Sequence, residues 1–569
     1  MATQLRNVND GGEAILQALR NLDIDYVMSS PGSEWGPVWE ALARQQVDGR
    51  DGPTYLSCWH ETLAVDLAIG YTAVTGRMQA VLLHAGAGLL QGSMGIHAAA
   101  LTGTPMVIMS GEALSYGEDR EFDPGRQWFT SLSVVGGPHR LVEPLVKFAN
   151  QASSPSTLYE QVVRAGELAQ RSPSGPTYLS VPIENMMHEW TPPAKMRKAP
   201  PAPKTRASDA DIEAVAALVA AAKNPVISTE SAGGSADGYA ALLSLAEALS
   251  IPVVEGMVAG VCNFPKDHPL HLGFGPQPAL KEADLVLVVK NRVPWYPPSD
   301  CPAVAKVVVI DDDPIKDQMV YQSLQADLYL EGDVPTTLRL LEAAVAGAGL
   351  DKSAAAERRA RAAAAHDALW KANRAAEAAS AGKGPIDPAW LCAELSRVLP
   401  DDTVYVDETT THRRFVQSHL QHKGPLSYFS VPSGLGQGLG FGLGVKLANP
   451  DRPVVTVIGD GAFLYNPVVQ SLGFAKQAKL PTLIVVFNNQ GYNAMRNNQL
   501  SYYPEGTGKQ HNLFLGHTID APEYSDLVAP FGGWGRRVED PADLESAINE
   551  GMAAVAEGRT AILNVVIGR

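Results

Sequence analysis

Two polar segments near the C-terminal end follow apolar runs that are typical of buried strands. The run "VVTVI" leads into Gly459-Asp460-Gly461, and the run "PTLIVVF" leads into Asn488-Asn489, with 26 residues between Gly461 and Asn488. In an open parallel sheet, both strand ends face the same carboxyl edge, which is where ligands bind. Glycines there allow a backbone to approach a ligand closely. The helix expected after Gly461 would offer free N–H groups to a phosphate.

The oxygen atoms of these segments predict a metal ion. The Asp460 carboxylate, an amide oxygen of the Asn488-Asn489 pair and a backbone carbonyl are hard ligands that suit Mg²⁺ or Ca²⁺. Together they predict a metal–diphosphate site that needs no lysine. For Gly-Asp-Gly alone, an ordinary strand–turn–helix connection is the better interpretation. The asparagine pair after a second strand favours the site instead.

This arrangement resembles the GDG…NN motif of thiamine-diphosphate-dependent enzymes, and the likeness covers nearly the whole chain. It implies a pyrimidine-binding domain, a central domain and a diphosphate-binding domain, in that order. It also implies that Asp460, Asn489 and the carbonyl of Gly491 hold Mg²⁺. The further cofactor-binding residues that it implies are Gly459, Gly461 and Ala462, with Thr409 and Thr410 of "DETTTH" near the diphosphate.

The segment "SGLGQGLGFGLG" carries glycine at every even position from Gly434 to Gly444. It does not match G-x-G-x-x-G, so a dinucleotide site is a weak interpretation. A flexible or tightly packed glycine-rich turn is the alternative. By the resemblance, this segment wraps the cofactor. Leu439 would be the bulky residue beneath the thiazolium that bends the cofactor, and backbone groups of Gln437 and Leu439 would contact the aminopyrimidine.

An acid, Glu61, opens the almost wholly small or apolar stretch "ETLAVDLAIGYTAV". A buried carboxylate is costly unless it has a partner or a task. The stretch resembles the region that carries the family's activating glutamate. The resemblance implies that Glu61 is buried and hydrogen-bonds the pyrimidine of a cofactor held mainly by the partner subunit. The helix would then be a dimer interface as well as half of an active site. A helix N-terminal acid favoured by the dipole is the alternative.

Two further residues narrow the expected chemistry. Ser33 lies in "SSPGSEW", a strand-to-helix turn, and His84 lies at a strand end, 23 residues after Glu61. Benzoylformate decarboxylases carry PGS and an "LHS"-type histidine at the corresponding places, whereas acetolactate synthases show PGG and GPGAT-like segments. The resemblance implies that Ser33 orients the substrate carboxylate and that His84 moves protons. An N-cap serine and a strand-end histidine are the alternatives.

The chain also departs from the benzoylformate pattern. Where those enzymes have a second active-site histidine, "VLVVKNRVPWYPP" offers Trp295 and Tyr296, which puts a two-histidine proton relay in doubt. Glu112, after "MVIMSG", is either an acid of the pocket or a strand-end residue. The segment "VVVIDDDP" resembles the nucleotide-facing strand end of relatives that bind FAD or ADP, and such a nucleotide in the central domain is the less favoured alternative. Trp35, Trp295, Tyr296 and Tyr492 suggest an aromatic pocket, but they do not identify the substrate side chain.

The elements that must position these residues alternate between short β-rich runs and helix-like segments. This alternation predicts an α/β fold of three consecutive doubly wound parallel-sheet domains. We place them at residues 1–190, 206–345 and 386–569. The linkers are residues 191–205, rich in proline and lysine, and residues 346–385, an alanine- and arginine-rich surface helix.

The overall composition limits the partners. The formal net charge is -16, which argues against nucleic acid. The apolar runs are too short to span a membrane, and the N-terminal residues lack the apolar core of a signal peptide. The four cysteines form no CxxC pair, which argues against a zinc site or a disulfide framework and favours the cytoplasm.

These observations and the resemblance predict a function. We expect Mg²⁺- and thiamine-diphosphate-dependent decarboxylation of a 2-oxo acid to an aldehyde, with Glu61, Ser33 and His84 as catalytic residues. An acetolactate-synthase-like carboligase is the alternative. A relative of 2-hydroxyacyl-CoA lyase or oxalyl-CoA decarboxylase is the second alternative, and a basic surface for CoA is not evident. The family builds each site from two chains, which implies a homodimer and is compatible with a homotetramer.

Overall fold

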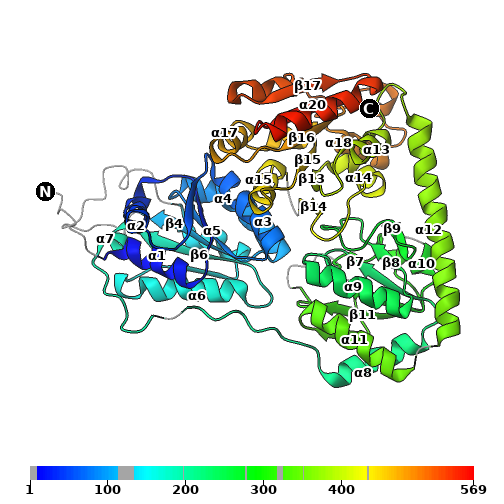
Figure 1. Ribbon diagram of the computed structural model, residues 1–569, viewed down its shortest axis with the longest axis horizontal. Helices are drawn as coiled ribbons and strands as arrows, with labels where there is room; N and C mark the ends of the chain where they lie inside the picture. Colours follow the sequence, from blue (N-terminus) through cyan, green and yellow to red (C-terminus); the bar gives the residue numbers. More distant parts are fainter. Residues whose placement is uncertain are drawn as a thin grey trace. The chain divides into compact units, whose positions relative to one another are not determined.

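Three parallel sheets organise the chain. The computed structural model describes residues 9–112, 134–196, 198–275, 278–316, 324–349, 351–431 and 435–568. Within these residues the strands form three six-stranded sheets with parallel neighbours, each accompanied by helices (Figure 1). Parallel strands need long crossover connections, and helices supply them. The predicted fold class is therefore confirmed.

The first sheet has the strand order β2-β1-β3-β4-β6-β5. Its inner strands β3, β4 and β6 are buried along their whole length, as expected for strands with helices on both faces. The strands are β1 (Tyr26–Ser29), β2 (Thr54–Ser57), β3 (Gln79–Leu83), β4 (Met106–Glu112), β5 (Phe148–Gln151) and β6 (Pro176–Pro182). The helices of this region include α1 (Gly11–Asn21), η1 (Ser33–Trp35), α2 (Gly36–Val47), α3 (Glu61–Thr75), α4 (Ala87–Thr102), α5 (Pro138–Val142), α6 (Leu158–Gln170) and α7 (Ile183–Met187).

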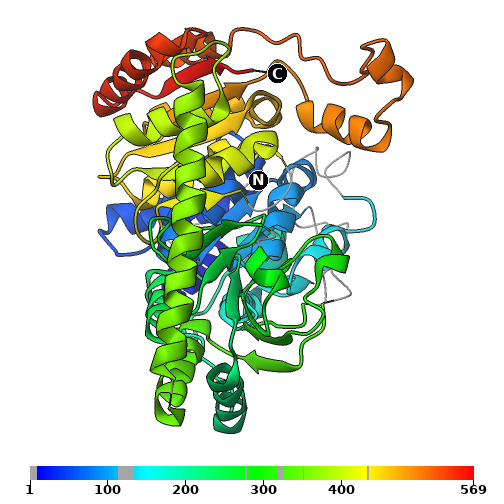
Figure 2. The same cartoon turned by 90° about the vertical axis from the view of Figure 1, so that its right-hand side faces the viewer.

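The second sheet has the order β12-β11-β10-β7-β8-β9 and a core of its own. Its strands are β7 (Pro225–Thr229), β8 (Val253–Glu255), β9 (His271–Phe274), β10 (Leu285–Val289), β11 (Lys306–Asp311) and β12 (Leu328–Glu331). Its helices include α8 (Asp209–Ala221), α9 (Ala236–Leu249), α10 (Pro278–Lys281) and α11 (Val334–Ala348). The long helix α12 (Lys352–Ser380) follows and contacts both β9 and α13 (Pro388–Val398), so it connects the second sheet to the third (Figure 2).

The third sheet has the order β14-β13-β15-β16-β18-β17. Its strands are β13 (Val404–Glu408), β14 (Tyr428–Ser430), β15 (Val454–Gly459), β16 (Leu483–Asn488), β17 (Trp534–Val538) and β18 (Ala561–Val566). The helices after α13 include η6 (Thr410–His412), α14 (Arg413–His419), α15 (Gly438–Ala448), α16 (Asp460–Tyr465), α17 (Val468–Ala478), α18 (Asn493–Tyr502), α19 (Thr507–Gln510) and α20 (Leu544–Ala556).

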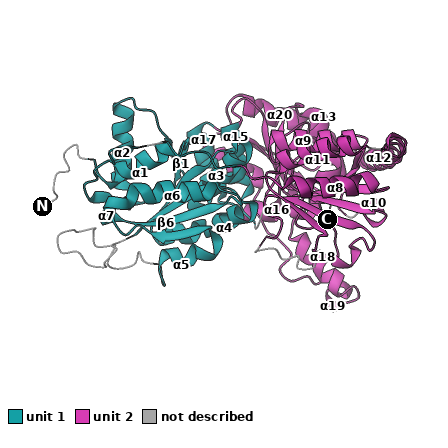
Figure 3. Cartoon of the chain, turned by 90° about the horizontal axis from the view of Figure 1, so that it is seen from below, with its two compact units in different colours: residues 1–203, 432–448, 466–479 teal, residues 204–431, 449–465, 480–569 magenta. Residues whose placement is uncertain are grey.

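The contacts divide the chain into two compact units (Figure 3). Unit 1 comprises residues 1–203, 432–448 and 466–479, and unit 2 comprises residues 204–431, 449–465 and 480–569. Helices α15 and α17 therefore group with the first sheet, although they lie in the last third of the sequence. One sheet lies in each of the three predicted blocks, and the boundaries given for those blocks stay predictions.

The glycine-rich segment forms a helix from Gly438 onward, and its first glycine, Gly434, lies outside the described residues. Helix α15 packs on α3 within unit 1. An added Cβ at Gly440 would lie 2.7 Å from the Cβ of Asp66, and one at Gly444 would lie 2.7 Å from the backbone nitrogen of Tyr71. The glycine-rich turn that we considered is wrong for this part, because close packing of the two backbones outweighs the low helix propensity of glycine.

Candidate active site

The predicted site residues fall into two groups, one in each compact unit. We call Glu61, His84 and their neighbour Glu34 the unit 1 cluster. We call Thr409, Gly459, Asp460, Asn489 and Gly491 the unit 2 cluster. Unit 1 also holds Ser33, Gln437 and Leu439, and unit 2 also holds Thr410, Gly461 and Ala462.

His84 is paired with an acid that the sequence analysis missed. Strands β1 and β3 are neighbours, so the residues that follow them, Glu34 and His84, emerge at the same edge of the sheet. Glu34 is fully buried, and its carboxylate oxygens lie 2.9 and 3.0 Å from Nδ1 of His84. One of these oxygens also accepts the backbone N–H of Ala85, at 2.7 Å. The signal in the sequence was an acid directly after Pro-Gly-Ser, in a turn between two buried elements.

Two glycines make room for the Glu34 carboxylate. An added Cβ at Gly32 would lie 2.6 Å from Nδ1 of His84, and one at Gly111 would lie 2.8 Å from Cδ of Glu34. Any side chain at these positions would therefore displace the acid or the histidine. A buried charge persists only where hydrogen bonds and opposite charge compensate its lost hydration. Here Ala85 and His84 provide that compensation.

The pair changes the proton affinity of the imidazole. The hydrogen bond that His84 donates to Glu34 raises the pKa of His84 above its ordinary value, although burial opposes the effect. The negative charges of Glu34 and Glu61 raise this pKa further. His84 therefore binds a proton more readily than a free histidine, and 26% of its side chain stays accessible.

Glu61 begins helix α3, as predicted, but it is only half-buried within the chain. The buried face of α3 starts at Leu63, and Glu61 occupies the first position of the helix. The burial of Glu61 against a cofactor held mainly by the partner subunit stays a prediction. An added Cβ at Gly88 would lie 3.0 Å from a carboxylate oxygen of Glu61. Among the described residues this carboxylate has no hydrogen-bond partner, so it can accept a ligand. The dipole alternative is compatible with the same position.

The rest of α3 is buried inside unit 1. The helix contacts α15, α4, β1 and β3 of the same unit. Its apolar surface therefore does not need a partner subunit to be covered, and the predicted dimer interface on this helix stays a prediction.

The other unit 1 predictions have mixed outcomes. Ser33 is exposed in η1 and is not an N-cap, because Gly32 and Trp35 occupy the capping positions of η1 and α2. Glu112 is the buried last residue of β4. The role of Ser33 stays a prediction.

Gln437 and Leu439 are both buried, and one polar group of each has a hydrogen-bond partner within unit 1. The side-chain amide of Gln437 donates to Asp66, at 3.1 Å. The backbone N–H of Leu439 donates to the side chain of Asn466, at 2.9 Å. The predicted contacts of these two residues with a cofactor therefore stay predictions, and the N–H of Leu439 would have to exchange partners to make one.

The unit 2 cluster lies at the carboxyl edge of the third sheet. Strands β13, β15 and β16 are neighbours there, with Glu408 level with Ile458 and Gly459 level with Phe487. Thr409, Asp460 and Asn489 follow directly after the three strand ends. This is the convergence that the two apolar runs predicted.

Asp460 and Asn489 together have the character of a cation site. The oxygens of the buried Asp460 accept the backbone N–H groups of Gly461, at 2.9 Å, and Gly491, at 3.0 Å. Burial raises the pKa of Asp460 to about 6, although these N–H groups oppose the effect. The amide oxygen of Asn489 is buried without a hydrogen-bond partner among the described residues. A buried unpaired oxygen is costly, and a cation would satisfy it.

The donor set fits Mg²⁺. This ion usually binds one or two carboxylates and completes its shell with phosphate oxygens and water. Asp460 would supply the carboxylate, Asn489 the amide oxygen and Gly491 the carbonyl oxygen. Clusters of three or more His, Cys, Asp and Glu side chains with ligating geometry are absent from the described part of the chain, so a purely carboxylate or thiolate site is not the alternative there.

Two glycines at this edge pack against aromatic rings of the chain itself. An added Cβ at Gly461 would lie 2.7 Å from the ring of Tyr492, and one at Gly491 would lie 2.6 Å from the ring of His517. This packing holds the segment after β16 against the start of α16, and the approach of a ligand to the glycines of this edge stays a prediction. Ala462, the next residue of α16, is buried.

A second missed acid supports Thr409. Both the backbone N–H and the hydroxyl of Thr409 donate to one oxygen of Asp407, at 2.8 and 2.7 Å. The hydroxyl of Tyr428 donates to the other oxygen, at 2.7 Å. The next residue, Thr410, has a φ of 44°, which is strained for a β-branched residue. Such strain concentrates at functional sites.

The four aromatic residues named for a pocket have different surroundings. Trp35 and Trp295 are buried core residues, and Trp35 donates to the carbonyl of Leu83 at 2.9 Å. Tyr296 is exposed, and Tyr492 packs on Gly461. At the carboxyl edge of the second sheet, Lys290 pairs with Asp312 and Arg292 pairs with Glu230. These pairings give no support to a nucleotide in the central domain.

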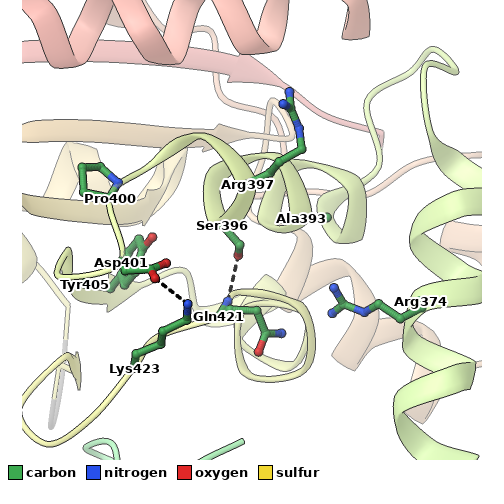
Figure 4. A pocket seen from close by; sticks show the side chains of 9 residues that line it. All are labelled: Arg374, Ala393, Ser396, Arg397, Pro400, Asp401, Tyr405, Gln421 and Lys423. Atoms are coloured by element: carbon green, nitrogen blue, oxygen red, sulfur yellow. Dashed lines mark hydrogen bonds and ion pairs between the residues drawn. The ribbon is translucent and has the colours of Figure 1, made fainter. Parts of the chain in front are cut away.

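A cavity of about 240 Å³ lies at the opposite edge of the third sheet (Figure 4). It is lined by Arg374, Ala393, Ser396, Arg397, Pro400, Asp401, Tyr405, Gln421 and Lys423. Lys423 pairs with Asp401 at 2.6 Å, and Arg397 pairs with Glu394 at 2.8 Å. Asp401 and Lys423 precede β13 and β14, so this cavity is at the amino edge and is separate from the unit 2 cluster.

Comparison with known proteins identifies the family of this chain. Residues 9–132 match the N-terminal thiamine pyrophosphate binding domain, residues 212–341 the central domain, and residues 408–565 the C-terminal thiamine pyrophosphate binding domain of thiamine pyrophosphate enzymes. The chain belongs to this family. In the part of the chain that the structure describes, no helix has both the length and the apolar character needed to cross a membrane.

Individual relatives carry different activities. The chain is 25% identical to a probable acetolactate synthase large subunit of Methanocaldococcus jannaschii, over 98% of this chain and 92% of that protein. It is 27% identical to benzoylformate decarboxylase of Pseudomonas aeruginosa, over 85% of this chain and 86% of that protein. The structure of the thiamine diphosphate-dependent 4-hydroxybenzoylformate decarboxylase of Rhodococcus jostii RHA1 has the same fold, with a TM-score of 0.79, 23% identity, and coverage of 98% of this chain and 99% of that one.

Proposed function

We propose that the protein decarboxylates a 2-oxo acid without oxidation and releases an aldehyde, with thiamine diphosphate and Mg²⁺ as cofactors. The observation that carries this proposal is the pairing of His84 with the buried Glu34. Release of an aldehyde requires a proton at the carbon that has lost CO₂. An accessible histidine with a raised pKa is suited to deliver it.

The remaining predicted residues take complementary roles. When bound, thiamine diphosphate supplies the electron sink that makes loss of CO₂ feasible. Asp460, Asn489 and the carbonyl of Gly491 would hold Mg²⁺. Glu61 would hold a proton at the pyrimidine ring, and Ser33 would orient the substrate carboxylate through its hydroxyl.

The other predicted cofactor residues support binding. Thr409 and Thr410 would lie near the diphosphate, where Asp407 holds Thr409 in place. The buried side chain of Leu439 would support the thiazolium and exclude water. A homodimer, or a homotetramer of two such dimers, would bring a unit 1 cluster and a unit 2 cluster together.

Carboligation like that of acetolactate synthases is the second candidate. It is favoured by the similarity to the acetolactate synthase of Methanocaldococcus jannaschii over nearly the whole chain. In that reaction the carbon that has lost CO₂ forms a bond to a second carbonyl compound and is not protonated. The unit 2 cluster suits both reactions equally, so the products must decide.

The test is a substrate panel with all products measured. Pyruvate, benzoylformate, phenylpyruvate and branched 2-oxo acids are supplied with thiamine diphosphate and Mg²⁺, and CO₂, aldehyde and acyloin are quantified. We expect aldehyde without acyloin from one preferred acid. Acetolactate formed from pyruvate as the main product would replace this proposal with the second candidate. No turnover of any acid would contradict both.

A further inference from the structure

Glu34 is the buried acid beside His84, and the proposed function uses it only to raise the pKa of that histidine. It sits in η1, directly after Ser33, and its side chain is fully buried. One carboxylate oxygen accepts the N–H of Ala85, and both oxygens lie within 3.0 Å of Nδ1 of His84. The two donors are consecutive residues, so the carboxylate holds the imidazole and the backbone beside it at the same time.

This contact decides which ring nitrogen can exchange a proton. A carboxylate accepts hydrogen bonds and has no proton to donate, so Nδ1 of His84 must carry one. The titrating position is then Nε2. Among the residues that the structure describes, Nε2 has no hydrogen-bond partner, and the ring is partly accessible.

The surroundings leave the pair little freedom. An added Cβ at Gly32 would meet Nδ1 of His84, and one at Gly111 would meet the Glu34 carboxyl group. Packing without spare volume restricts both side chains to one arrangement. Two acids act on the imidazole: Glu34 from η1 and Glu61 from α3. The adjacent strand β4 ends in a third acid, the buried Glu112.

We propose that Glu34 is a positioning residue for His84. It keeps the imidazole in the form with the proton on Nδ1 and in one orientation, so that Nε2 is the atom that exchanges a proton with the substrate. The use that His84 makes of this proton rests on the proposed function, whereas the pairing of Glu34 with His84 is independent of it.

A double-mutant cycle tests whether Glu34 acts through His84. The variants are Glu34→Gln, His84→Asn and the two combined, all assayed with the acid preferred by the wild type. We expect Glu34→Gln to lower kcat/KM by about 10- to 100-fold, as loss of a partner that orients a histidine does elsewhere. In the His84→Asn background the same change should cause no further loss. Losses that multiply would overturn the proposal, because Glu34 would then act independently of His84.

The pH profile gives a readout that a merely structural role would not move. The limb of the kcat/KM profile that disappears in His84→Asn reports His84. Removing the charge of Glu34 lowers the pKa of His84, so this limb should move to lower pH in Glu34→Gln. An unmoved limb would overturn the proposal. Glu13→Gln is the matched control, since Glu13 is also buried and pairs with Arg20 at 2.8 Å, so it should lose stability but keep the limb in place.

The form of the imidazole is measurable without any activity. In protein labelled with ¹⁵N-histidine, the His84 signals are identified by their absence from His84→Asn. Above its titration range, wild-type His84 should carry its proton on Nδ1, and Glu34→Gln should lose this preference. A proton on Nε2 in the wild type would overturn the proposal, even if Glu34→Gln does not fold. A protein without decarboxylase activity would still give this result, so failure of the proposed function is distinguishable from failure of the pairing.

Discussion

The two clusters of candidate site residues use different chemistry. The unit 1 cluster combines three groups that titrate, with Glu34 hydrogen-bonded to His84 and Glu61 acting on the same imidazole through its charge. The unit 2 cluster contains one carboxylate, Asp460, together with the amide oxygen of Asn489 and backbone groups.

The difference indicates that the two clusters would take different parts in the proposed reaction. In unit 1, hydrogen bonding raises the pKa of a partly accessible histidine, which suits a group that gains and loses protons. In unit 2, burial raises the pKa of Asp460 to about 6, because loss of hydration disfavours the charged carboxylate. A bound cation would favour the charged form and reverse the effect. Under the proposed function, unit 1 would handle protons, and unit 2 would hold Mg²⁺ and the diphosphate.

The largest expected effect is the loss of cofactor affinity when the charge of Asp460 is removed, and it tests the role proposed for unit 2. Asp460→Asn removes the one charged ligand of the proposed Mg²⁺ site, so affinity for Mg²⁺ and thiamine diphosphate should fall by at least about 100-fold. Calorimetric titration measures it. Asp451→Asn, at an exposed position just before β15, is the matched control and should bind normally. Full binding by Asp460→Asn would show that unit 2 does not hold the ion through this residue.

The next effect should appear in turnover but not in binding. Glu61→Gln keeps the size of the side chain and removes its ability to hold and release a proton. We expect kcat to fall by roughly 10²- to 10⁴-fold, while affinity for Mg²⁺ changes little. Steady-state rates at saturating cofactor measure kcat. Glu40→Gln, at an exposed position on α2, is the control and should keep the wild-type kcat. An unchanged kcat would remove Glu61 from the proposed mechanism.

A smaller effect concerns the packing that brings Gln437 and Leu439 into unit 1. Gly444→Ala would force a Cβ against Tyr71 and the backbone of α3, so the free energy of unfolding should fall by about 1–3 kcal/mol. Chemical denaturation measures it. The same change at Gly347 on α11, where a Cβ meets nothing within 4 Å, should raise stability slightly. Equal responses at the two glycines would mean that α15 and α3 are not closely packed.

The smallest effect is the pH dependence of stability that His84 contributes. Its pKa is raised in the folded chain, so its contribution is fully present below the unfolded value and is lost as pH rises through the folded pKa. The stability advantage of the wild type over His84→Asn should therefore shrink as pH rises above the ordinary histidine pKa of about 6.5. Denaturation at several pH values measures it. An advantage that grows with pH would contradict a raised pKa.

Much of the unit 2 cluster could be predicted because its signals are local. Asp460 and Asn489 directly follow apolar strands, and parallel strands place their carboxyl ends at one edge. Asp407 was missed, although it lies only two residues before Thr409, because an acid at a strand end has many possible partners. Its partner Tyr428 became visible only when β13 and β14 were seen side by side.

Less of the unit 1 cluster could be predicted, because its contacts join distant segments. Glu34 and His84 are 50 residues apart and meet because β1 and β3 are neighbours. A glycine-rich turn was the alternative considered for residues 433–444, yet from Gly438 onward the segment packs as a helix on α3. Glu61 begins α3 and is half-buried within the chain, and its burial against a cofactor held mainly by the partner subunit stays a prediction.

The sequence by itself determined the three parallel sheets, the family and the residues at the third sheet's edge, because apolar periodicity and short motifs act over neighbouring residues. Only the tertiary structure decided that Glu34 holds His84, that Tyr428 and Thr409 share Asp407, and that α15 belongs with the first sheet. These contacts depend on strand order and on how closely backbones approach. Both are set by packing between segments that are far apart in the chain.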